Sequence, residues 1–163
     1  IYEVNAMRIS WDEYFMSIAQ IVALRSSCSR KKVGAVLVKG KKILGTGYNG
    51  APADIDNCLE IGCLMRNSGC VRAIHAEINV ILQTDNQDRQ GATLYTTTRP
   101  CWSCANTIAN SGITEVVYAE DYRIDFDIVI RLFEEKNIKL RQYNNIYEVA
   151  YVKKEDNPQE FMD

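Results

Sequence analysis

One histidine and two cysteines have the residue types and the spacing to hold a metal ion. Cys101 and Cys104 form a Cys-x-x-Cys pair directly after Pro100, and His75 precedes them in the chain. Imidazole nitrogen and thiolate sulfur are preferred zinc ligands, and three protein ligands leave the fourth tetrahedral position open to water. The set therefore predicts a catalytic zinc site rather than a structural one.

Glu77 lies two residues after His75 and can reach such a water molecule without being a ligand. Zinc lowers the pKa of its water to near neutrality, so hydroxide forms at physiological pH. Glu77 would take the water proton and pass it to the reacting molecule. Burial and the metal charge would pull its own pKa in opposite directions. The alternative is a solvated helix residue.

Each half of this pattern alone is ambiguous, because a lone histidine has many uses and a lone Cys-x-x-Cys can be a redox pair. Together, in this order and with Pro100 in place, they match H-x-E…P-C-x-x-C. That is the known signature of the zinc-dependent nucleobase deaminases. The resemblance implies that hydroxide attacks C4 of a cytosine ring and that Glu77 delivers protons to N3 and to the departing amine.

Length and composition limit the architecture. At 163 residues and 47% hydrophobic, the chain has enough apolar material for one globular core. We expect a single domain over residues 8–153, preceded by an N-terminal extension at 1–7 and followed by a disordered tail at 154–163.

The composition also bears on partners and location. A net charge of −2 lacks the basic excess of nucleic-acid binders, and no run of about 18 apolar residues could span a membrane. Six cysteines without a recognisable secretory segment are typical of reduced thiols that are available for metal. We therefore expect a cytoplasmic protein with no nucleic-acid or membrane partner.

Hydrophobic periodicity predicts the elements that position the site. Ser10 and Glu13 have capping-box spacing before a helix that should run to about Arg25. Apolar runs and turn residues predict a hairpin of strands 33–38 and 43–47. The remaining predicted elements are a helix at 73–83 presenting His75 and Glu77, a strand at 93–97, a helix at 101–110, a strand at 115–119, a helix at 125–136, and strands at 138–143 and 147–152.

Strands that alternate with helices indicate an α/β protein, a three-layer α/β/α sandwich around a mixed five- to six-stranded sheet. The strand–Pro–helix turn would put Cys101 and Cys104 in a first helical turn, where the helix dipole favours thiolates. Segment 48–71 is long and rich in Gly, Asn and Cys, so it should be functional or specifically ordered.

A wider resemblance covers residues 8–143. The chain is similar to the deoxycytidylate (dCMP) deaminases of the phage and bacterial type, within the cytidine deaminase superfamily. The stretches that carry the resemblance are WDEYFM at 11–16, VGAV at 33–36, GTGYNGAP at 45–52, HAEIN at 75–79 and PCWSCA at 100–105. The resemblance implies a cytidine deaminase-like fold with zinc held by His75, Cys101 and Cys104. It also implies hydrolysis of dCMP to dUMP, with Glu77 as proton shuttle. The dUMP would be supplied for dTMP synthesis.

The same resemblance implies where substrate would bind, namely at Arg25, Ser29, Asn49, Ala76 and Tyr122. The phosphate needs donors, and a basic cluster after the first helix, at 25–32, is similar to the family's phosphate-contacting corner. We favour Arg25, because it ends a helix packed on the sheet and its guanidinium fork suits phosphate. The alternative for each member of the cluster is a solvated surface residue.

Regulation is also implied by the resemblance. Relatives build a nucleotide effector site from the stretch that contains Gly47, Tyr48, Asn49 and Gly50. We therefore expect a homo-oligomer, a hexamer, activated by dCTP and inhibited by dTTP, with Mg²⁺ bridging the triphosphate. The alternative is that the glycines only make a tight turn and Asn49 serves the substrate alone.

Four cysteines remain outside the predicted catalytic site: Cys28, Cys58, Cys63 and Cys70. Some relatives hold a second, structural zinc in this region, with a histidine among its ligands. This chain has one histidine in total. The four cysteines therefore form either an all-cysteine zinc site or a set of free buried thiols.

Other functions compete with dCMP deamination. A deaminase could act on dCTP or on another cytosine or adenine substrate, and a polynucleotide substrate would require a basic channel with stacking aromatics. A non-enzymatic zinc module would need a fourth side-chain ligand and would have no use for Glu77.

Overall fold

The computed structural model describes residues 8–122 and 124–144. The predicted extension at 1–7, strand at 147–152 and tail at 154–163 lie outside the described residues. In the described part, no helix is long and apolar enough to cross a membrane.

A mixed sheet of five strands forms the centre of the molecule, in the order β2-β1-β5-β6-β7. Strand β1 pairs antiparallel with both β2 and β5, whereas β5, β6 and β7 run parallel. The bounds are Gly34–Lys39 for β1, Lys42–Tyr48 for β2, Thr93–Thr98 for β5, Glu115–Glu120 for β6 and Lys139–Gln142 for β7. The mixed sheet predicted from the sequence is confirmed.

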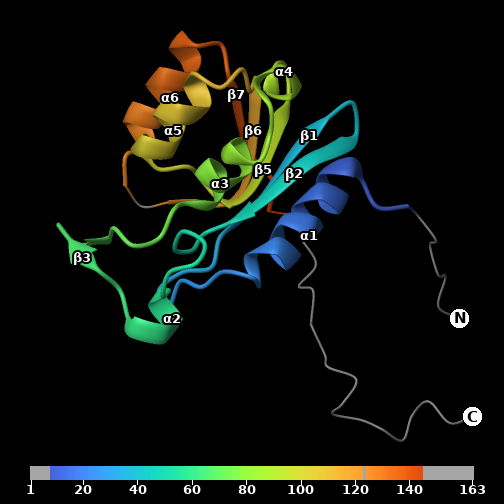
Figure 1. Ribbon diagram of the computed structural model, residues 1–163. Helices are drawn as coiled ribbons and strands as arrows, with labels where there is room; N and C mark the ends of the chain where they lie inside the picture. Colours follow the sequence, from blue (N-terminus) through green and yellow to red (C-terminus); the bar gives the residue numbers. More distant parts are fainter. Residues whose placement is uncertain (1–7, 123, 145–163) are drawn as a thin grey trace, which may run out of the picture.

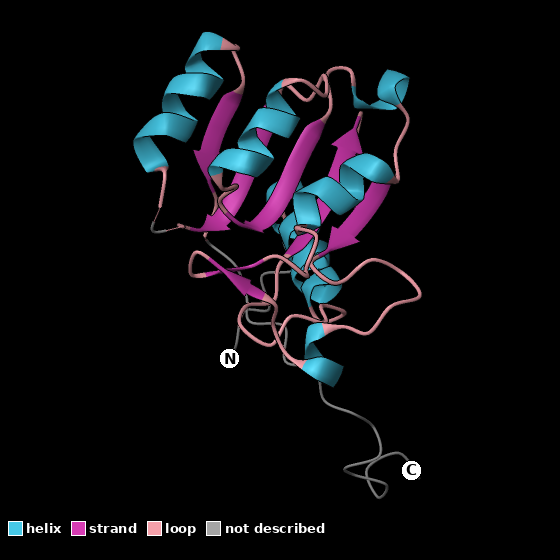
Figure 2. Cartoon of the chain, turned by 60° about the vertical axis from the view of Figure 1, so that its left-hand side comes forward, coloured by secondary structure: helices cyan, strands magenta, loops and turns pink. Residues whose placement is uncertain are grey.

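Helices cover both faces of this sheet (Figure 1). One face packs against α1 (Trp11–Ala23), and the other packs against α3 (Ala76–Leu82), α5 (Trp102–Ala109) and α6 (Phe126–Glu135). Two cores result: Phe15 and Met16 of α1 join one, while Val80 of α3 and Ile108 of α5 join the other. The three layers are visible in the turned view (Figure 2).

Helix α1 begins as its sequence predicts. The Oγ of Ser10 accepts a hydrogen bond of 3.1 Å from the backbone N–H of Glu13, which satisfies one free donor of the first turn. The reciprocal half of the capping box does not form among the described residues. Instead the Glu13 side chain is buried, and its Oε1 has no hydrogen-bond partner there.

The long segment after β2 was predicted as one loop, but it contains short elements. Helix α2 (Cys58–Ile61) has a capping box formed by Asn57 and Glu60, and strands β3 (Met65–Arg66) and β4 (Gly69–Cys70) make a small hairpin. A further short helix, α4 (Asn86–Arg89), follows α3. These elements are only two to four residues long, too short for periodicity to reveal.

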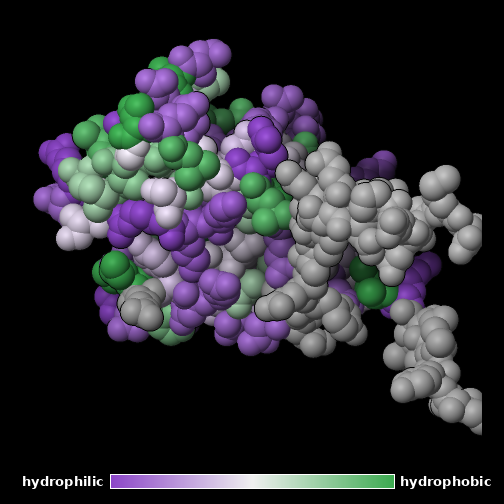
Figure 3. All heavy atoms as spheres, turned by 90° about the horizontal axis from the view of Figure 1, so that it is seen from below, coloured by the Kyte–Doolittle hydropathy of each residue, from purple (hydrophilic) through white to green (hydrophobic). Residues whose placement is uncertain are grey.

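The segment 55–71 projects from the sheet at the bottom of Figure 1. Its large apolar side chains are at least half exposed, and they are Ile55, Leu59, Ile61, Leu64, Met65 and Val71. Figure 3 shows the molecule from below. On the surface seen there, hydrophobic residues gather toward the left side, among hydrophilic ones.

Gly47 sets how closely α3 approaches the sheet. A Cβ atom built on Gly47 would overlap the carbonyl oxygen of Ala76 and lie 2.6 Å from the backbone nitrogen of Val80. A residue with a side chain would therefore push the helix away from β2. Because His75 and Glu77 stand at the start of this helix, the glycine helps to place them.

Candidate active site and metal centre

The three predicted zinc ligands come together at the starts of two helices. His75 is the N-cap residue of α3, Cys101 is the N-cap residue of α5, and Cys104 lies in the first turn of α5. The predicted helices began slightly early, at 73 and 101. Helices α3 and α5 lie on the same face of the sheet, so their N-termini present the three side chains to one point.

The spacing of the ligand atoms fits zinc. The Nδ1 atom of His75 lies 3.5 Å from the Sγ of Cys101 and 3.3 Å from the Sγ of Cys104. All three ligand atoms lie within 4.8 Å of one another. Tetrahedral bonds of about 2.0–2.3 Å separate zinc ligands by about 3.3–3.8 Å. One imidazole and two thiols thus stand at the separation that zinc requires.

The electrostatics of the cluster favour metal binding. Interaction with the Cys104 side chain foremost, and also with His75, lowers the pKa of Cys101 to about 4, although burial opposes the change. The same contact with Cys101, followed by burial, raises the pKa of the Cys104 thiol. The two thiols therefore differ in how readily they lose a proton. A divalent cation would stabilise the second thiolate.

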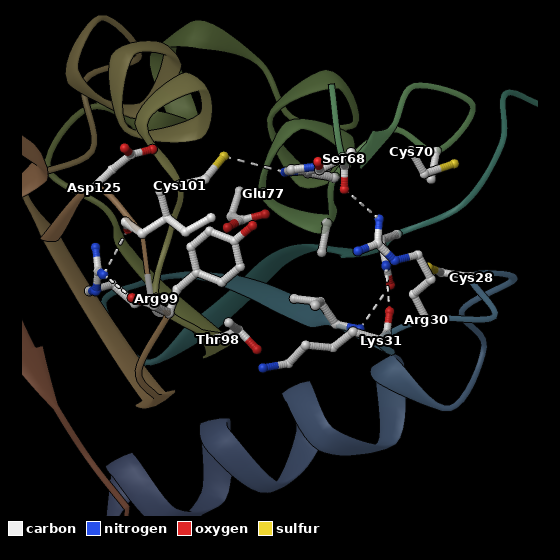
Figure 4. Close-up of a pocket in the computed structure, with 18 residues that line it drawn as sticks. Cys28, Arg30, Lys31, Ser68, Cys70, Glu77, Thr98, Arg99, Cys101 and Asp125 are labelled. Carbon is white, nitrogen blue, oxygen red and sulfur yellow. Dashed lines mark hydrogen bonds between the residues drawn. The ribbon is translucent and has the colours of Figure 1, made fainter. Parts of the chain in front are cut away.

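Glu77 is the second residue of α3 and its side chain is buried, with 4% of the residue exposed. Burial is the main cause that raises the pKa of its carboxyl group, and the nearby His75 opposes that shift. The carboxyl group turns toward the space between Cys101 and Thr98 in the close-up (Figure 4). A carboxyl group that binds protons more readily than usual is suited to exchanging them with a reactant.

A cavity of about 480 Å³ contains this cluster. His75, Glu77 and Cys101 line it together with Arg30 and Lys31, so a polar reactive centre and two cationic side chains share one space. In Figure 4, Cys101 lies toward one end and Arg30 toward the other, with Glu77 between them, and the Lys31 side chain extends toward Thr98. The volume lies within the range of about 300–1,000 Å³ typical of small-molecule sites.

The predicted substrate residues divide into two groups. Asn49, Ala76 and Tyr122 line the cavity, whereas Arg25 and Ser29 are exposed and are not among its described lining residues. The basic cluster at 25–32 does reach the cavity, but through Arg30 and Lys31. The preference for Arg25 therefore finds no support in the geometry, because the chain turns after α1 and presents later residues of the cluster.

Asn49 determines that turn. Its Oδ1 accepts hydrogen bonds from the Ser26 hydroxyl at 2.6 Å and from the Val33 N–H at 2.8 Å, and its Nδ2 donates to the Lys31 carbonyl at 2.7 Å. The side chain is buried, so these bonds are shielded from water. Asn49 thereby ties the basic segment to the end of β2 and holds Lys31 at the cavity.

The four predicted effector residues occupy different environments. Asn49 lines the cavity, Gly47 packs against α3, and Tyr48 is exposed. Gly50 pairs with Ile74 through two backbone hydrogen bonds, of 3.1 and 2.8 Å, directly before His75.

Three of the four remaining cysteines form a second cluster. The sulfur atoms of Cys58, Cys63 and Cys70 lie within 4.8 Å of one another, with 3.6 Å between Cys58 and Cys70. Cys28 is not a member; it is buried and lines the cavity, and its N–H donates to Ser26. All six cysteines of the chain are free thiols.

The titration of the second cluster is uneven. Burial, and then the neighbouring Cys70 and Cys63, raise the pKa of Cys58 to about 12. Burial also acts to raise that of Cys70, but hydrogen bonds from the backbone of Arg72 and Ala73 outweigh it and lower the pKa to about 7.

Arg99 is among the lining residues that the sequence did not predict. Arg99 lies against the cavity with its side chain fully buried. A buried arginine is uncommon and must be paired by groups that lie close only in the folded chain. The only local signal was its position before Pro100, next to the Cys-x-x-Cys pair.

Comparisons with known proteins agree with this site. A family model of the cytidine and deoxycytidylate deaminase zinc-binding region matches residues 9–120. The deoxycytidylate deaminase of Mycobacterium phage D29 is 48% identical over 127 residues, which are 70% of this chain and 98% of the phage protein. ComE operon protein 2 of Bacillus subtilis (strain 168) is 42% identical over 137 residues, covering 83% of this chain and 72% of that protein.

Among solved structures, the dCMP deaminase of cyanophage S-TIM5 in complex with dCMP and dUMP has a TM-score of 0.70 and 28% identity. The match covers 84% of this chain and 99% of the cyanophage chain. It confirms the predicted fold class.

A mixed sheet that brings one histidine and two cysteines together beside a buried glutamate defines the zinc-dependent deaminase class. The chain belongs to the cytidine and deoxycytidylate deaminase zinc-binding family. The predicted resemblance to the dCMP deaminases in particular is confirmed by the phage D29 relative.

Proposed function

We propose that this chain hydrolyses dCMP to dUMP and ammonia. The observation that carries the proposal is one cavity lined by the buried Glu77, by the ligands His75 and Cys101, and by the cationic Arg30 and Lys31. Cys104 completes the ligand set next to His75 and Cys101. Relatives named deoxycytidylate deaminase support dCMP as the substrate. The dUMP product would supply dTMP synthesis.

His75, Cys101 and Cys104 would hold a catalytic zinc, which fits the separations of their ligand atoms. When bound, zinc supplies a Lewis acid that lowers the pKa of water to near neutrality. Cys101 and Cys104 lie at the start of α5, so free N–H groups of its first turn favour the thiolate form of both.

Glu77 moves the protons. It accepts one proton from the attacking water and donates it to N3 of the cytosine ring as oxygen adds to C4. It then carries the second water proton to the amino group, so that the C4–N bond breaks and ammonia leaves. The carboxyl group ends as it began, and one water is consumed for each amine released. Its burial favours this role because solvent does not compete for the proton.

The phosphate of dCMP would lie against Arg30 and Lys31. Arg30 donates to the Ser68 carbonyl at 3.1 Å, and Lys31 pairs with the exposed Glu120 at 3.1 Å. Both partners are at the surface, so a dianionic phosphate can compete for the two cations. Asn49, Ala76 and Tyr122, which also line the cavity, would face the sugar and base.

The activity is tested by incubating zinc-loaded protein with dCMP, dCTP, deoxycytidine and single-stranded DNA and following loss of the cytosine chromophore. Fast turnover of dCMP with little of the others is the expected result. Faster turnover of dCTP would change the substrate, and no turnover of any compound by protein of full zinc content would refute a deaminase.

We further propose a structural zinc at Cys58, Cys63 and Cys70, with a fourth ligand from outside this three-cysteine cluster, because structural zinc takes four. The sulfur atoms of Cys58 and Cys70 lie 3.6 Å apart, which is close to the distance of about 3.8 Å between two thiolates bound to tetrahedral zinc. The ligands come from α2, from the following loop and from β4. A metal there would hold the projecting segment 55–71 beside the cavity, which Cys70 also lines.

We also propose that the enzyme is a hexamer activated by dCTP and inhibited by dTTP, each bound with Mg²⁺ near Tyr48, Asn49 and Gly50. Gly50 pairs with Ile74, next to His75, so a ligand on this loop has a short path to the zinc ligands. Coupling requires only that dCTP prefer the active conformation, by about 1–3 kcal/mol. Light scattering and dCMP saturation with each triphosphate test this proposal, and a monomer indifferent to both would refute it.

A further inference from the structure

The side chain of Arg99 is completely buried directly after β5. Its Nε donates to Asp121 Oδ1 at 2.5 Å, and its Nη2 donates to the carbonyl oxygens of Tyr122 and of Ile124, the latter at 3.1 Å. The guanidinium carbon lies 4.8 Å from the centre of the Phe126 ring. One arginine therefore binds four residues that follow β6 and lead into α6.

These partners form one wall of the catalytic cavity. Tyr122, Ile124 and Asp125 line the cavity, and so does the fully buried Arg99 side chain that holds them. In Figure 4, Arg99 and Asp125 stand at the end of the cavity opposite Arg30. The wall thus faces the cationic end across the space that a nucleotide would fill.

Asp125 is anchored by α6, because its carbonyl oxygen accepts a hydrogen bond from the Val129 N–H at 3.0 Å, but the other described wall residues have few hydrogen bonds besides those with Arg99. Asp125 adopts a left-handed backbone conformation with φ of 65°, and Ile124 is 58% exposed. Asp121 and Tyr122 add only the short-range bond from the Tyr122 N–H to Asp121 Oδ1, at 2.8 Å. An exposed connection with few contacts of its own depends on whatever side chain ties its carbonyl groups down. Arg99 supplies two of those ties and a charge-assisted bond besides.

Burying a guanidinium group is unfavourable unless its donors are satisfied. Here Nη1 is buried without a partner among the described residues, so the side chain is not fully satisfied. An apolar side chain would fill the same volume without that cost. An arginine at this position is therefore explained by the hydrogen bonds that it donates to the wall residues, and not by stability alone.

We infer that Arg99 is a positioning residue that fixes the Tyr122 wall and thereby sets the affinity for the nucleotide, while the reacting groups are held independently of it. This inference rests on the proposed function for its substrate. Helix α3 places Glu77 and His75. Cys101 is held by the backbone hydrogen bond from the Ala105 N–H to its carbonyl oxygen, and the Arg99 backbone is held by the bond from its N–H to the Glu120 carbonyl oxygen. Neither bond involves the Arg99 side chain. Losing the guanidinium should loosen the wall and leave the zinc ligands in place.

The test compares Arg99→Met with Arg89→Met. Arg89 is a matched control, because it also donates to two carbonyl groups, those of Ile81 and Thr84, and also has a buried nitrogen without a partner in the described structure. It is not among the described residues that line the cavity. A general loss of stability would be common to both variants.

For Arg99→Met we expect a KM for dCMP raised about tenfold or more, a kcat within about threefold of wild type, and full zinc content at the catalytic site. Arg99→Lys, which keeps the charge but not the fork, should recover part of the affinity. Arg89→Met should lower the Tm with KM unchanged. An unchanged KM in Arg99→Met, or a fall in kcat alone, would overturn the inference.

Two measurements keep the result independent of folding and of activity. Asp121→Ala removes an exposed carboxylate that accepts hydrogen bonds from Arg99 and from the Tyr122 N–H, so it should fold, and it should raise KM by a smaller factor in the same direction. Amide exchange at Tyr122, whose N–H is bonded to Asp121, should accelerate in Arg99→Met and not in Arg89→Met when it is measured by NMR without ligand. Unchanged exchange would refute the inference that Arg99 fixes the Tyr122 wall. A wild-type protein that does not deaminate dCMP would refute only the proposed function.

Discussion

Arg141 and Asp12 form a two-pronged ion pair that joins the last described strand to the start of the first helix. Nη1 of Arg141 lies 2.7 Å from Oδ2 of Asp12, and Nη2 lies 2.7 Å from Oδ1. The Tyr95 hydroxyl donates to the same carboxylate at 2.7 Å, and the Nε of Arg141 donates to Glu115 at 2.6 Å. The network connects α1, β5, β6 and β7 and should stabilise the layer on the α1 side of the sheet.

Replacing Asp12 with Asn should lower the free energy of unfolding at pH 7 by about 1–3 kcal/mol, because the charge-assisted bonds to Arg141 are lost. Lys139→Met is the control: Lys139 is exposed and lies 3.7 Å from Glu115, so its removal should change stability by less than about 1 kcal/mol. Urea unfolding of the three proteins measures both effects. Equal losses in the two variants would contradict the assignment.

The same pair predicts a dependence on pH. The hydrogen bond from Arg141 is the main cause that lowers the pKa of Asp12, against the effect of burial. A lowered folded-state pKa stabilises the protein above the unfolded pKa of about 3.9, and that stabilisation is lost as pH falls through the folded value. The difference between wild type and Asp12→Asn should therefore shrink below about pH 4. A difference that grows on acidification would contradict this reasoning.

Glu77→Gln should retain zinc and bind dUMP, but lose turnover by at least about a hundredfold, because the proton carrier is gone while the side-chain volume is kept. Zinc analysis, calorimetry with dUMP and single-turnover kinetics separate these properties. Glu13→Gln is a matched control, being a buried glutamate on α1 away from the cavity. Substantial activity in zinc-loaded Glu77→Gln would remove Glu77 from the mechanism.

Lys31→Met should weaken dCMP binding by about tenfold or more while changing deoxycytidine binding little, because only dCMP carries the phosphate. Arg25→Met, an exposed cation of the same cluster outside the described cavity lining, should leave both affinities unchanged. Competition binding with the two ligands gives the ratio. If Arg25→Met weakened dCMP binding more than Lys31→Met did, Arg25 would be the phosphate ligand, as the sequence analysis favoured.

Gly47→Ala should destabilise the protein by about 1–3 kcal/mol or more, because the added methyl group meets the backbone of α3. It should also lower the affinity for zinc, since His75 begins that helix. Gly69→Ala is the comparison: its Cβ would meet only the Arg66 carbonyl at 3.6 Å, an ordinary contact. Thermal unfolding and zinc titration report the outcome. A Gly47→Ala variant with wild-type stability and zinc affinity would show that α3 does not pack tightly against β2 at Gly47.

Purified protein that has never met a chelator should contain about two zinc ions per chain if Cys58, Cys63 and Cys70 hold metal. Cys58→Ser should then reduce the content to about one, and Cys28→Ser should leave it unchanged because Cys28 lies outside the three-cysteine cluster. Elemental analysis decides the matter. One zinc in the wild-type chain would favour the free-thiol interpretation, and loss of zinc in Cys28→Ser would make it a ligand.

Local sequence was sufficient for the features that depend on neighbouring residues. The order of His75, Glu77 and the Cys-x-x-Cys pair can be read directly, because ligand chemistry belongs to residue types and their spacing. The Ser10 cap and the alternation of helices and strands follow from local hydrogen bonding and periodicity. These signals predicted the family and the mixed sheet, and both are confirmed.

Only the tertiary structure decided which basic residues face the cavity. Lys31 rather than Arg25 is presented because Asn49, 16 to 23 positions away from its partners, holds the intervening turn with buried hydrogen bonds. Arg99 likewise meets partners 22 to 25 positions further along the chain. Periodicity carries no information about such distant pairs, since their energies arise only after the sheet has brought the segments together. The ligand set was therefore legible in the sequence, whereas the walls of the cavity were not.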